Sequence, residues 1–107
     1  MDILFEKAIK EGTYIITLNF IDEDNEDDLP PTTVLWTLQD PSGQVINNRE
    51  DETETPAAEV NIVLSGDDLA ITGQAAERIL IVHGTYNSSY GNNLPYRKGF
   101  QFEIEDM

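Results

Sequence analysis

Apolar and polar side chains alternate with a period of two in short runs along this chain, and that pattern constrains the fold more than any other feature. Such alternation indicates β-strands with one buried face. In the clearest run, Tyr14, Ile16, Leu18 and Phe20 lie on one side. No stretch of ten residues has a convincing helical pattern. The runs predict seven strands, near residues 3–8, 13–20, 34–38, 44–47, 60–64, 78–86 and 100–105.

Turn and cap signals separate these strands. Asp40, Pro41 and Gly43 occupy positions that a β-turn favours, so we expect a hairpin between the third and fourth strands. Ser65, followed three residues later by Asp68, suits a capping box and predicts one helical turn.

The strand count and the length together predict the fold class. A chain of 107 residues has apolar material for one core. Seven short strands with fairly regular turns predict an all-β chain, an antiparallel immunoglobulin-like β-sandwich. We therefore expect residues 1–107 to form one domain, with Trp36 in its core.

The strand near residues 78–86 is apolar on both faces, so its period alone does not say which face is inward. If Leu80 and Val82 point into the core, Ile79, Ile81 and His83 point outward. Either arrangement leaves surplus apolar surface, which usually marks a protein contact. The candidate contact residues on this sheet are Leu35, Ile79 and Ile81.

The formal charge is strongly negative, because 21 Asp and Glu stand against 6 Lys and Arg and give −15. Nucleic acids and anionic membranes bind basic surfaces, so we expect neither as a partner. Six of the seven residues 22–28 are acidic, as are four of the five residues 50–54. Alternating strand directions predict that both segments lie at one end of the sandwich, together with residues 87–99.

Residues 87–96 are rich in Tyr, Ser, Asn and Gly, the composition of a binding loop. We therefore predict Tyr86, Tyr90 and Tyr96 as contact residues. The acidic segments leave three interpretations open: docking on a basic partner, solubility, or a calcium site. The spacing is not that of an EF-hand, and the candidate calcium ligands are Asp22, Asp24, Asp27 and Asp28.

The residue types that carry catalysis are absent or badly placed, so we expect no enzyme and no cofactor other than calcium. The single histidine, His83, falls inside a predicted strand, and no serine lies in a Gly-x-Ser-x-Gly elbow. With no cysteine, disulfides and zinc–thiolate sites are excluded. The N-terminus has no secretory pattern, and no apolar run approaches a membrane span. We expect a protein made in a cytoplasm that stays soluble.

An ordered series of turn and core signatures runs through the chain, at residues 11–13, 22–24, 31–40, 42–43, 60–65, 78–82, 84–88 and 91–95, and at Phe102. In this series the chain resembles small immunoglobulin-like proteins encoded among the virion genes of tailed bacteriophages and prophages. The resemblance implies a capsid decoration or tail accessory component, made in the host cytoplasm and attached to other virion proteins, in several copies on a symmetric particle. Residues 22–28 depart from that family's pattern by being far more acidic.

Two alternatives come from other functional classes. An acidic inhibitor that mimics the DNA backbone is compatible with the net charge, although mimicry needs carboxylates spaced along an extended surface. A calcium-stabilised binding module is the other alternative, because a ligand that binds only the folded state raises stability.

Overall fold

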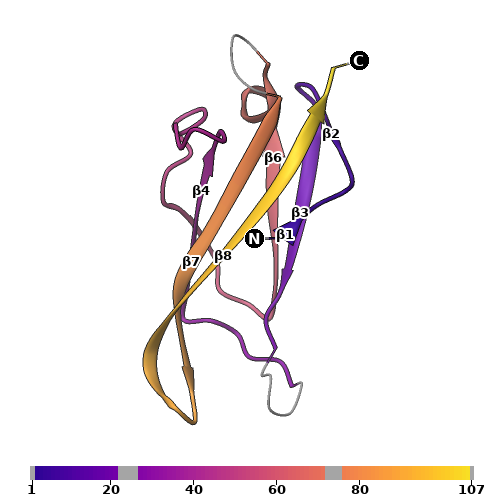
Figure 1. Ribbon diagram of the computed structural model, residues 1–107. Coiled ribbons are helices and arrows are strands. Elements are labelled where there is room, and N and C mark those ends of the chain that lie inside the picture. Colours follow the sequence, from indigo (N-terminus) through magenta and orange to yellow (C-terminus); the bar gives the residue numbers. More distant parts are fainter. Residues whose placement is uncertain (1, 22–26, 72–75, 107) are drawn as a thin grey trace.

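The computed structural model describes residues 2–21, 27–71 and 76–106, and it shows two β-sheets packed face to face (Figure 1). The smaller sheet is an antiparallel pair, β3 (Thr13–Asn19) and β6 (Glu59–Ser65). The larger sheet has the order β1-β8-β7-β4-β5, and β2 pairs with a further stretch of β8. The predicted all-β class is confirmed. The elements of the larger sheet are β1 (Asp2–Ile3), β2 (Ala8–Ile9), β4 (Thr33–Gln39), β5 (Glu52–Glu54), β7 (Glu77–Ser88) and β8 (Gly91–Glu105).

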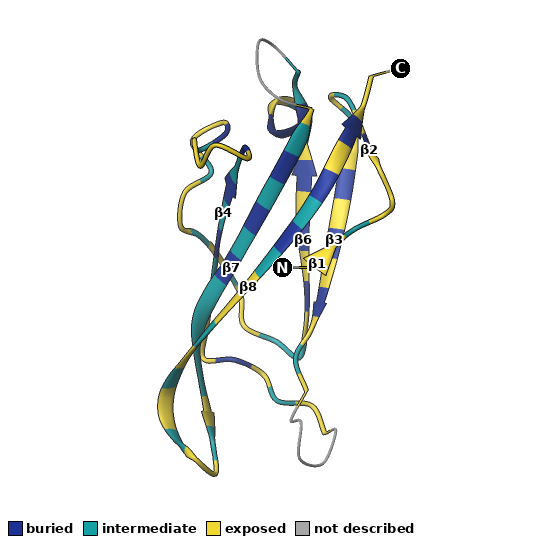
Figure 2. Cartoon of the chain, in the orientation of Figure 1, coloured by how far each residue is buried: buried dark blue, intermediate teal, exposed yellow. Residues whose placement is uncertain are grey.

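Inward-facing apolar rows from both sheets form one core (Figure 2). Burial alternates residue by residue along β3 and β6, as the period-two pattern predicts. Trp36 on β4 is 3% exposed, which confirms its predicted place. Tyr14 of the smaller sheet stacks on Phe102 of the larger one, with ring centroids 4.6 Å apart, so aromatic packing joins the two layers directly.

The structure shows which face of strand β7 points into the core, a question that the sequence leaves open. Leu80 and Val82 are almost completely buried, so their side chains point into the core. Ile79, Ile81 and His83 alternate with them and therefore point outward, each partly exposed.

The predicted return strand at residues 44–47 is wrong. Only one isolated bridge, between Gln39 and Val45, forms there. Asn47, Asn48 and Asp51 all have left-handed backbone angles, which turn the chain away before pairing with β4 resumes at β5. Because the residues of β5 lie in an acidic segment without apolar alternation, the pattern gave no sign of a strand.

The expectation of a purely antiparallel fold is also wrong. The predicted first strand is divided into β1 and β2, which both run parallel to β8, so the larger sheet is mixed. In addition, β8 begins at Gly91, nine residues before the predicted start of the last strand at Phe100. Paired with β7, it makes a hairpin much longer than the pattern indicates.

The predicted helical turn is present as the 3-10 turn η1 (Gly66–Leu69), held by the buried carboxylate of Asp68. This carboxylate accepts hydrogen bonds from the backbone of Ser65 at 3.0 Å, from Asn47 at 2.9 Å and from Arg49 at 2.9 Å. Burial raises the pKa of Asp68, but these hydrogen bonds and the charge of Arg49 outweigh burial, and the net pKa is lowered. One side chain thus joins η1 to the segment that leads into β5.

A buried guanidinium completes the polar cluster at this end of the sandwich. The side chain of Arg78 is fully buried, at the start of β7. It donates hydrogen bonds to the backbone carbonyls of Asp68 at 3.3 Å, Ala70 at 2.7 Å and Glu77 at 2.9 Å. Burial lowers the pKa of Arg78, because removing a cation from water penalises its charged form. Arg78 thus joins the start of β7 to the carbonyl of Asp68 within η1 and to that of Ala70, the residue after it.

Replacing Asp68 with Asn should lower the free energy of unfolding by about 1–3 kcal/mol at neutral pH, because one of the two buried carboxylate oxygens that accept hydrogen bonds from Ser65, Asn47 and Arg49 becomes an NH2 donor, and the negative charge beside Arg49 is lost. The folded pKa of Asp68 lies below its unfolded value of about 3.9, so its contribution is complete above that value. It is lost as the pH falls through the folded pKa. The stability difference between wild type and Asp68→Asn should therefore shrink below about pH 4.

Urea unfolding followed by the fluorescence of Trp36, repeated from pH 3 to pH 7, measures this difference. Asp67→Asn is the matched control, since Asp67 is the exposed neighbour in the same turn. A loss of stability in the control equal to that in Asp68→Asn would show that net charge alone is responsible.

Candidate functional site

The β7–β8 hairpin extends beyond the rest of the larger sheet. The last pair between β7 and β4 is Thr85 with Thr33. From Tyr86 paired with Leu94 to the turn, β7 and β8 pair only with each other within the described residues. Figure 1 shows this hairpin projecting below the body of the molecule. We call residues 84–96 the hairpin arm.

The hairpin arm contains no Asp, Glu, Lys or Arg, although 25% of the chain's residues are charged. At that frequency, a segment of 13 residues would carry about three charges. Tyr, Ser, Asn and Gly make up ten of its positions instead. These residues supply rigid aromatic contact area and adaptable hydrogen bonds in protein-binding loops, so the arm can be covered by a partner without burying a charge.

Tyr90 stands at the tip of the arm and is 80% exposed. Its backbone N–H donates to the Ser88 hydroxyl at 3.1 Å, and the N–H of Asn93 donates to the Asn87 side chain at 2.8 Å. These local hydrogen bonds restrain the turn, and restraint of this kind lowers the entropy lost when a partner binds. Of the three tyrosines predicted as contacts, Tyr90 is the one most open to a partner.

Tyr96 anchors the base of the arm. Its hydroxyl donates to the carbonyl of Thr33 at 2.8 Å, and its ring packs edge-on against Phe20 with centroids 5.5 Å apart. Tyr86 lies beside it, at 6.4 Å between ring centroids. Burial raises the pKa of Tyr96 to about 12. The structure therefore brings Tyr86 and Tyr96 together at the base and places Tyr90 apart from them at the tip.

Gly84 permits this anchor, a role that was not predicted from the sequence. It pairs with Tyr96 across the hairpin and with Val34 on the other side. A Cβ atom at this position would overlap the Thr33 carbonyl oxygen and lie 2.8 Å from the Tyr96 hydroxyl. A glycine inside an apolar strand is the available signal, because it often marks a close approach of another group.

Gly84→Ala should destabilise the fold by about 1–3 kcal/mol, the usual cost of adding a methyl group where no space exists. The cost should be smaller in a Tyr96→Phe background, because one of the two overlapping oxygens is then absent. Urea denaturation of the single and double variants measures this coupling. Asn92→Ala, an exposed substitution on the same arm, should be neutral. Equal costs of Gly84→Ala in both backgrounds would contradict the role given to the Tyr96 hydroxyl.

The predicted contact residues Leu35, Ile79 and Ile81 share the side of the larger sheet that faces away from the core, which we call the outer face. Leu35 pairs with His83, and Thr37 pairs with Ile81. All three aliphatic side chains are partly exposed. His83 lies on the same side, with its Nε2 atom 3.0 Å from a carboxylate oxygen of Asp51. The outer face is thus a short apolar strip with polar neighbours.

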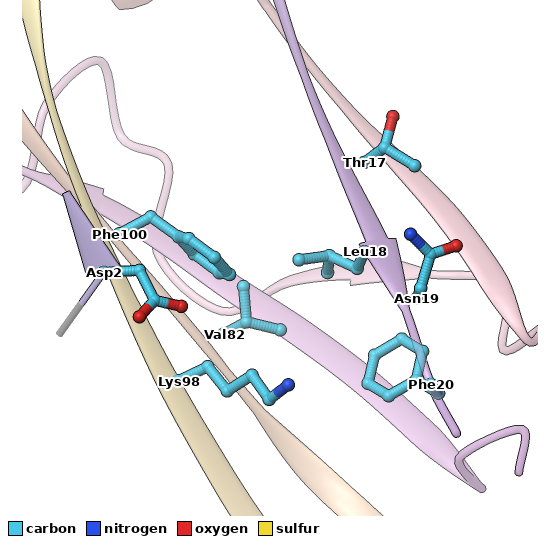
Figure 3. Close-up of a pocket in the computed structure, with 8 residues that line it drawn as sticks. All are labelled: Asp2, Thr17, Leu18, Asn19, Phe20, Val82, Lys98 and Phe100. Carbon is cyan, nitrogen blue, oxygen red and sulfur yellow. The ribbon is translucent and has the colours of Figure 1, made fainter. Parts of the chain in front are cut away.

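A pocket of about 220 Å³ lies between the two sheets, at the edge of β3 (Figure 3). Leu18 and Phe20 line it from the β3 side, and Phe100 lines it from β8. Asp2 and Lys98 lie on the β1 and β8 side of the same space. Ligand pockets usually measure about 300–1,000 Å³, so this space is small for a site that encloses a metabolite.

The acids of residues 50–54 do not lie at the end of the sandwich where they were predicted, while residues 22–26 of the other acidic segment lie outside the described residues. Arg49 reaches Asp68 at the opposite end, and the chain then runs along β4 as β5. The acids of residues 50–54 are therefore spread along the edge of the larger sheet. Glu54 accepts a hydrogen bond from the indole of Trp36 at 3.0 Å, and Glu52 lies 3.4 Å from Arg49. The error follows from the misplaced return strand: the strand that runs antiparallel to β4 begins at Glu52 and not at Gln44, so these acids lie along the sheet and not beyond its end.

The candidate calcium ligands are only partly covered by the structure. Asp22 and Asp24 lie outside the described residues. Asp27 and Asp28 are exposed, and Asp28 forms an isolated bridge with Ile21. Within residues 2–21, 27–71 and 76–106, no three His, Asp or Glu side chains gather as potential metal ligands. Calcium binding stays a prediction.

Comparison of the chain with protein-family models, with curated proteins and with solved structures found no match. In the part of the chain that the structure describes, no helix has the length and apolarity needed to cross a membrane.

Proposed function

We propose that this protein is a non-enzymatic structural module of a tailed-phage virion, which docks on capsid or tail proteins through its hairpin arm. The observation that carries the proposal is the projection of 13 consecutive uncharged residues, with Tyr90 exposed at the tip, from a body of strongly negative charge. The proposal has three parts: the immunoglobulin-like fold, the docking surface and the virion setting.

The pairing of the strands supports an immunoglobulin-like fold. Strands β3 and β6 form one sheet, while β4, β7 and β8 form the centre of the other, with β5 at the edge beside β4. Immunoglobulin-type sandwiches divide their strands between two sheets in a similar way. The parallel pairing of β1 and β2 with β8 means that the first strand joins the larger sheet.

The chemistry of the arm supports a role in docking. Interface cores are depleted in charged residues and enriched in tyrosine, because burying an unpaired charge is costly. Tyr90 provides a large amphipathic ring with few rotatable bonds, as anchor residues do. The anionic body would stay in water and keep neighbouring copies soluble.

The virion setting rests on the resemblance of the turn and core signatures to small virion proteins of tailed phages. Repeated docking on a symmetric particle suits a small module with one projecting arm. The DNA-mimic and calcium alternatives stay predictions, and no observation in the described residues favours either one.

Mass spectrometry of purified particles, from the phage or prophage that encodes the chain, tests the setting. The protein should be present at a copy number that matches a repeating capsid or tail component. Its absence from particles would rule out the virion role.

Tyr90→Ala should weaken binding of the added protein to particles that lack it by about thirtyfold or more, the effect of losing a hot-spot residue of about 2 kcal/mol. The variant should unfold at the same urea concentration as wild type, because the ring is exposed. Cosedimentation with the particles measures binding. Ser89→Ala, next to Tyr90 and also exposed, is the matched control. Binding of Tyr90→Ala at wild-type strength would mean that the arm is not the docking surface.

A further inference from the structure

The smaller sheet has an unpaired edge. Strand β3 pairs with β6 on one side, and no described strand pairs with its other side, which we call the β3 edge. At the two ends of the pair, the N–H of Gly66 donates to the Gly12 carbonyl at 3.0 Å, and the N–H of Phe20 donates to the Ala58 carbonyl at 2.8 Å. Because backbone groups in an antiparallel pair alternate in direction, the even-numbered residues of β3 bond to β6. The odd-numbered residues therefore direct their N–H and C=O groups out of the β3 edge. They are Thr13, Ile15, Thr17 and Asn19.

The β3 edge lacks the features that protect the edges of the larger sheet. Natural edge strands are usually short, charged or interrupted by proline, because a long bare edge pairs readily with other chains. In the larger sheet, β5 carries Glu52 and Glu54 at one edge, and β1 and β2 at the other are two residues each. The seven residues of β3 contain no charge, no glycine and no proline. The β3 edge is therefore suited to accept a further strand.

The pocket of about 220 Å³ lies beside this edge (Figure 3). Residues 17–20 of β3 line it, and the other lining residues belong to β1, β7 and β8. No residue of β6 lines it, so the pocket is on the side of β3 that faces away from β6. Leu18, Val82 and Phe100 supply an apolar wall. A cavity of about 150 Å³ holds a benzene molecule, so this pocket has room for one large apolar side chain.

We propose that an extended segment of a partner protein adds to the β3 edge as a further strand of the smaller sheet and places one large apolar side chain in the pocket. Side chains of an added strand alternate between the two faces of the sheet, so those on the inner face enter the gap between the sheets. Main-chain hydrogen bonds to the edge give affinity, and the pocket selects the side chain. The edge thus specifies an extended backbone, and the pocket specifies what that backbone carries.

A second copy of β3 does not meet this description. Its inward side chains Ile16 and Leu18 are buried in their own core, at 4% and 5% exposure, so they are not free to fill the pocket of another copy. An acidic segment is disfavoured as well, because the chain has a net charge of −15. We therefore expect a neutral or basic partner segment, rich in β-branched residues, with one Phe or Leu on its inner face. This contact goes beyond docking through the hairpin arm and is independent of it, since no residue of the arm takes part.

Fluorescence anisotropy of a labelled synthetic peptide, added to the full chain, tests the proposal. The probe is Lys-Thr-Val-Thr-Phe-Thr-Val-Lys, which favours the strand conformation and has no acidic residue. It should bind, and replacing its Phe with Ser should weaken binding by about tenfold or more, the effect of burying one aromatic side chain. Both peptides have the same charge, so general attraction to an anionic protein affects them equally. No binding at about 1 mM peptide, or equal binding of the two peptides, would overturn the proposal.

Methylation of the peptide backbone tests the strand pairing. Only alternate N–H groups of an added strand face β3, and the others face water. N-methylation of the three Thr residues, or of the two Val residues and Phe, should therefore have unequal effects. One set should weaken binding by about tenfold or more and the other by less than about threefold, as expected for the loss of main-chain hydrogen bonds in one set alone. Equal effects of the two sets would contradict addition as a strand.

Proline at residue 17 tests the edge in the protein itself. The N–H of Thr17 points out of the β3 edge, so Thr17→Pro removes no hydrogen bond to β6. Asn61→Pro is the matched control, because Asn61 pairs with Thr17 and directs its N–H out of the opposite edge of the same sheet. Both variants affect the side-chain hydrogen bond between Thr17 and Asn61 at 2.7 Å. Thr17→Pro should weaken peptide binding by about tenfold or more, and Asn61→Pro by less than about threefold.

Two results with these variants would overturn the proposal. Equal loss of peptide binding in Thr17→Pro and Asn61→Pro would show that the β3 edge is not the binding surface. A wild-type dimer in sedimentation equilibrium that Thr17→Pro dissociates would show that a second copy occupies the edge. The peptide experiments use the wild-type chain, so they do not depend on how either proline variant folds.

Discussion

The pleat of strand β7 is the constraint on which the rest of the structure depends. Successive side chains of a strand point to opposite sides, so burying Leu80 and Val82 obliges Ile79 and Ile81 to face outward. The same alternation continues to Gly84, on the inner side, where the Tyr96 hydroxyl crosses to Thr33. The core, the outer face and the anchor of the hairpin arm therefore follow from one strand being placed in one register.

At the end of the sandwich away from the hairpin arm, buried polar groups fix the path of the chain. The carboxylate of Asp68 and the guanidinium of Arg78 are both buried, and both are hydrogen-bonded. A buried charge without such partners would cost several kcal/mol, so these contacts permit few alternative paths. The contact between Asp68 and Arg49 ties η1 to the segment that leads into β5. The acids of that segment follow the sheet edge, where charge discourages pairing with another chain.

Charge is distributed unevenly over the surface, and the hairpin arm is a region that lacks it. The arm carries no charged residue over 13 positions, although the chain has a net charge of −15. Because desolvating a carboxylate is costly, this is a surface that an anionic protein can offer to a partner.

The sequence by itself determined the all-β class, the inward rows of β3, β4 and β6, the place of Trp36 and the turn at Ser65 with Asp68. These features are local, because a period of two and a capping pair act within a few residues. The Tyr, Ser, Asn and Gly composition of the arm was also readable along the chain.

Only the tertiary structure decided which face of β7 is inward, since that strand is apolar on both sides. It also decided the parallel pairing of β1 and β2, the place of β5 beside β4, and the crossing of Tyr96 over Gly84. Each of these joins residues far apart in the chain. Such contacts form because buried polar groups need hydrogen-bond partners and because the core must be filled without voids. Neither requirement produces a periodic pattern in the sequence.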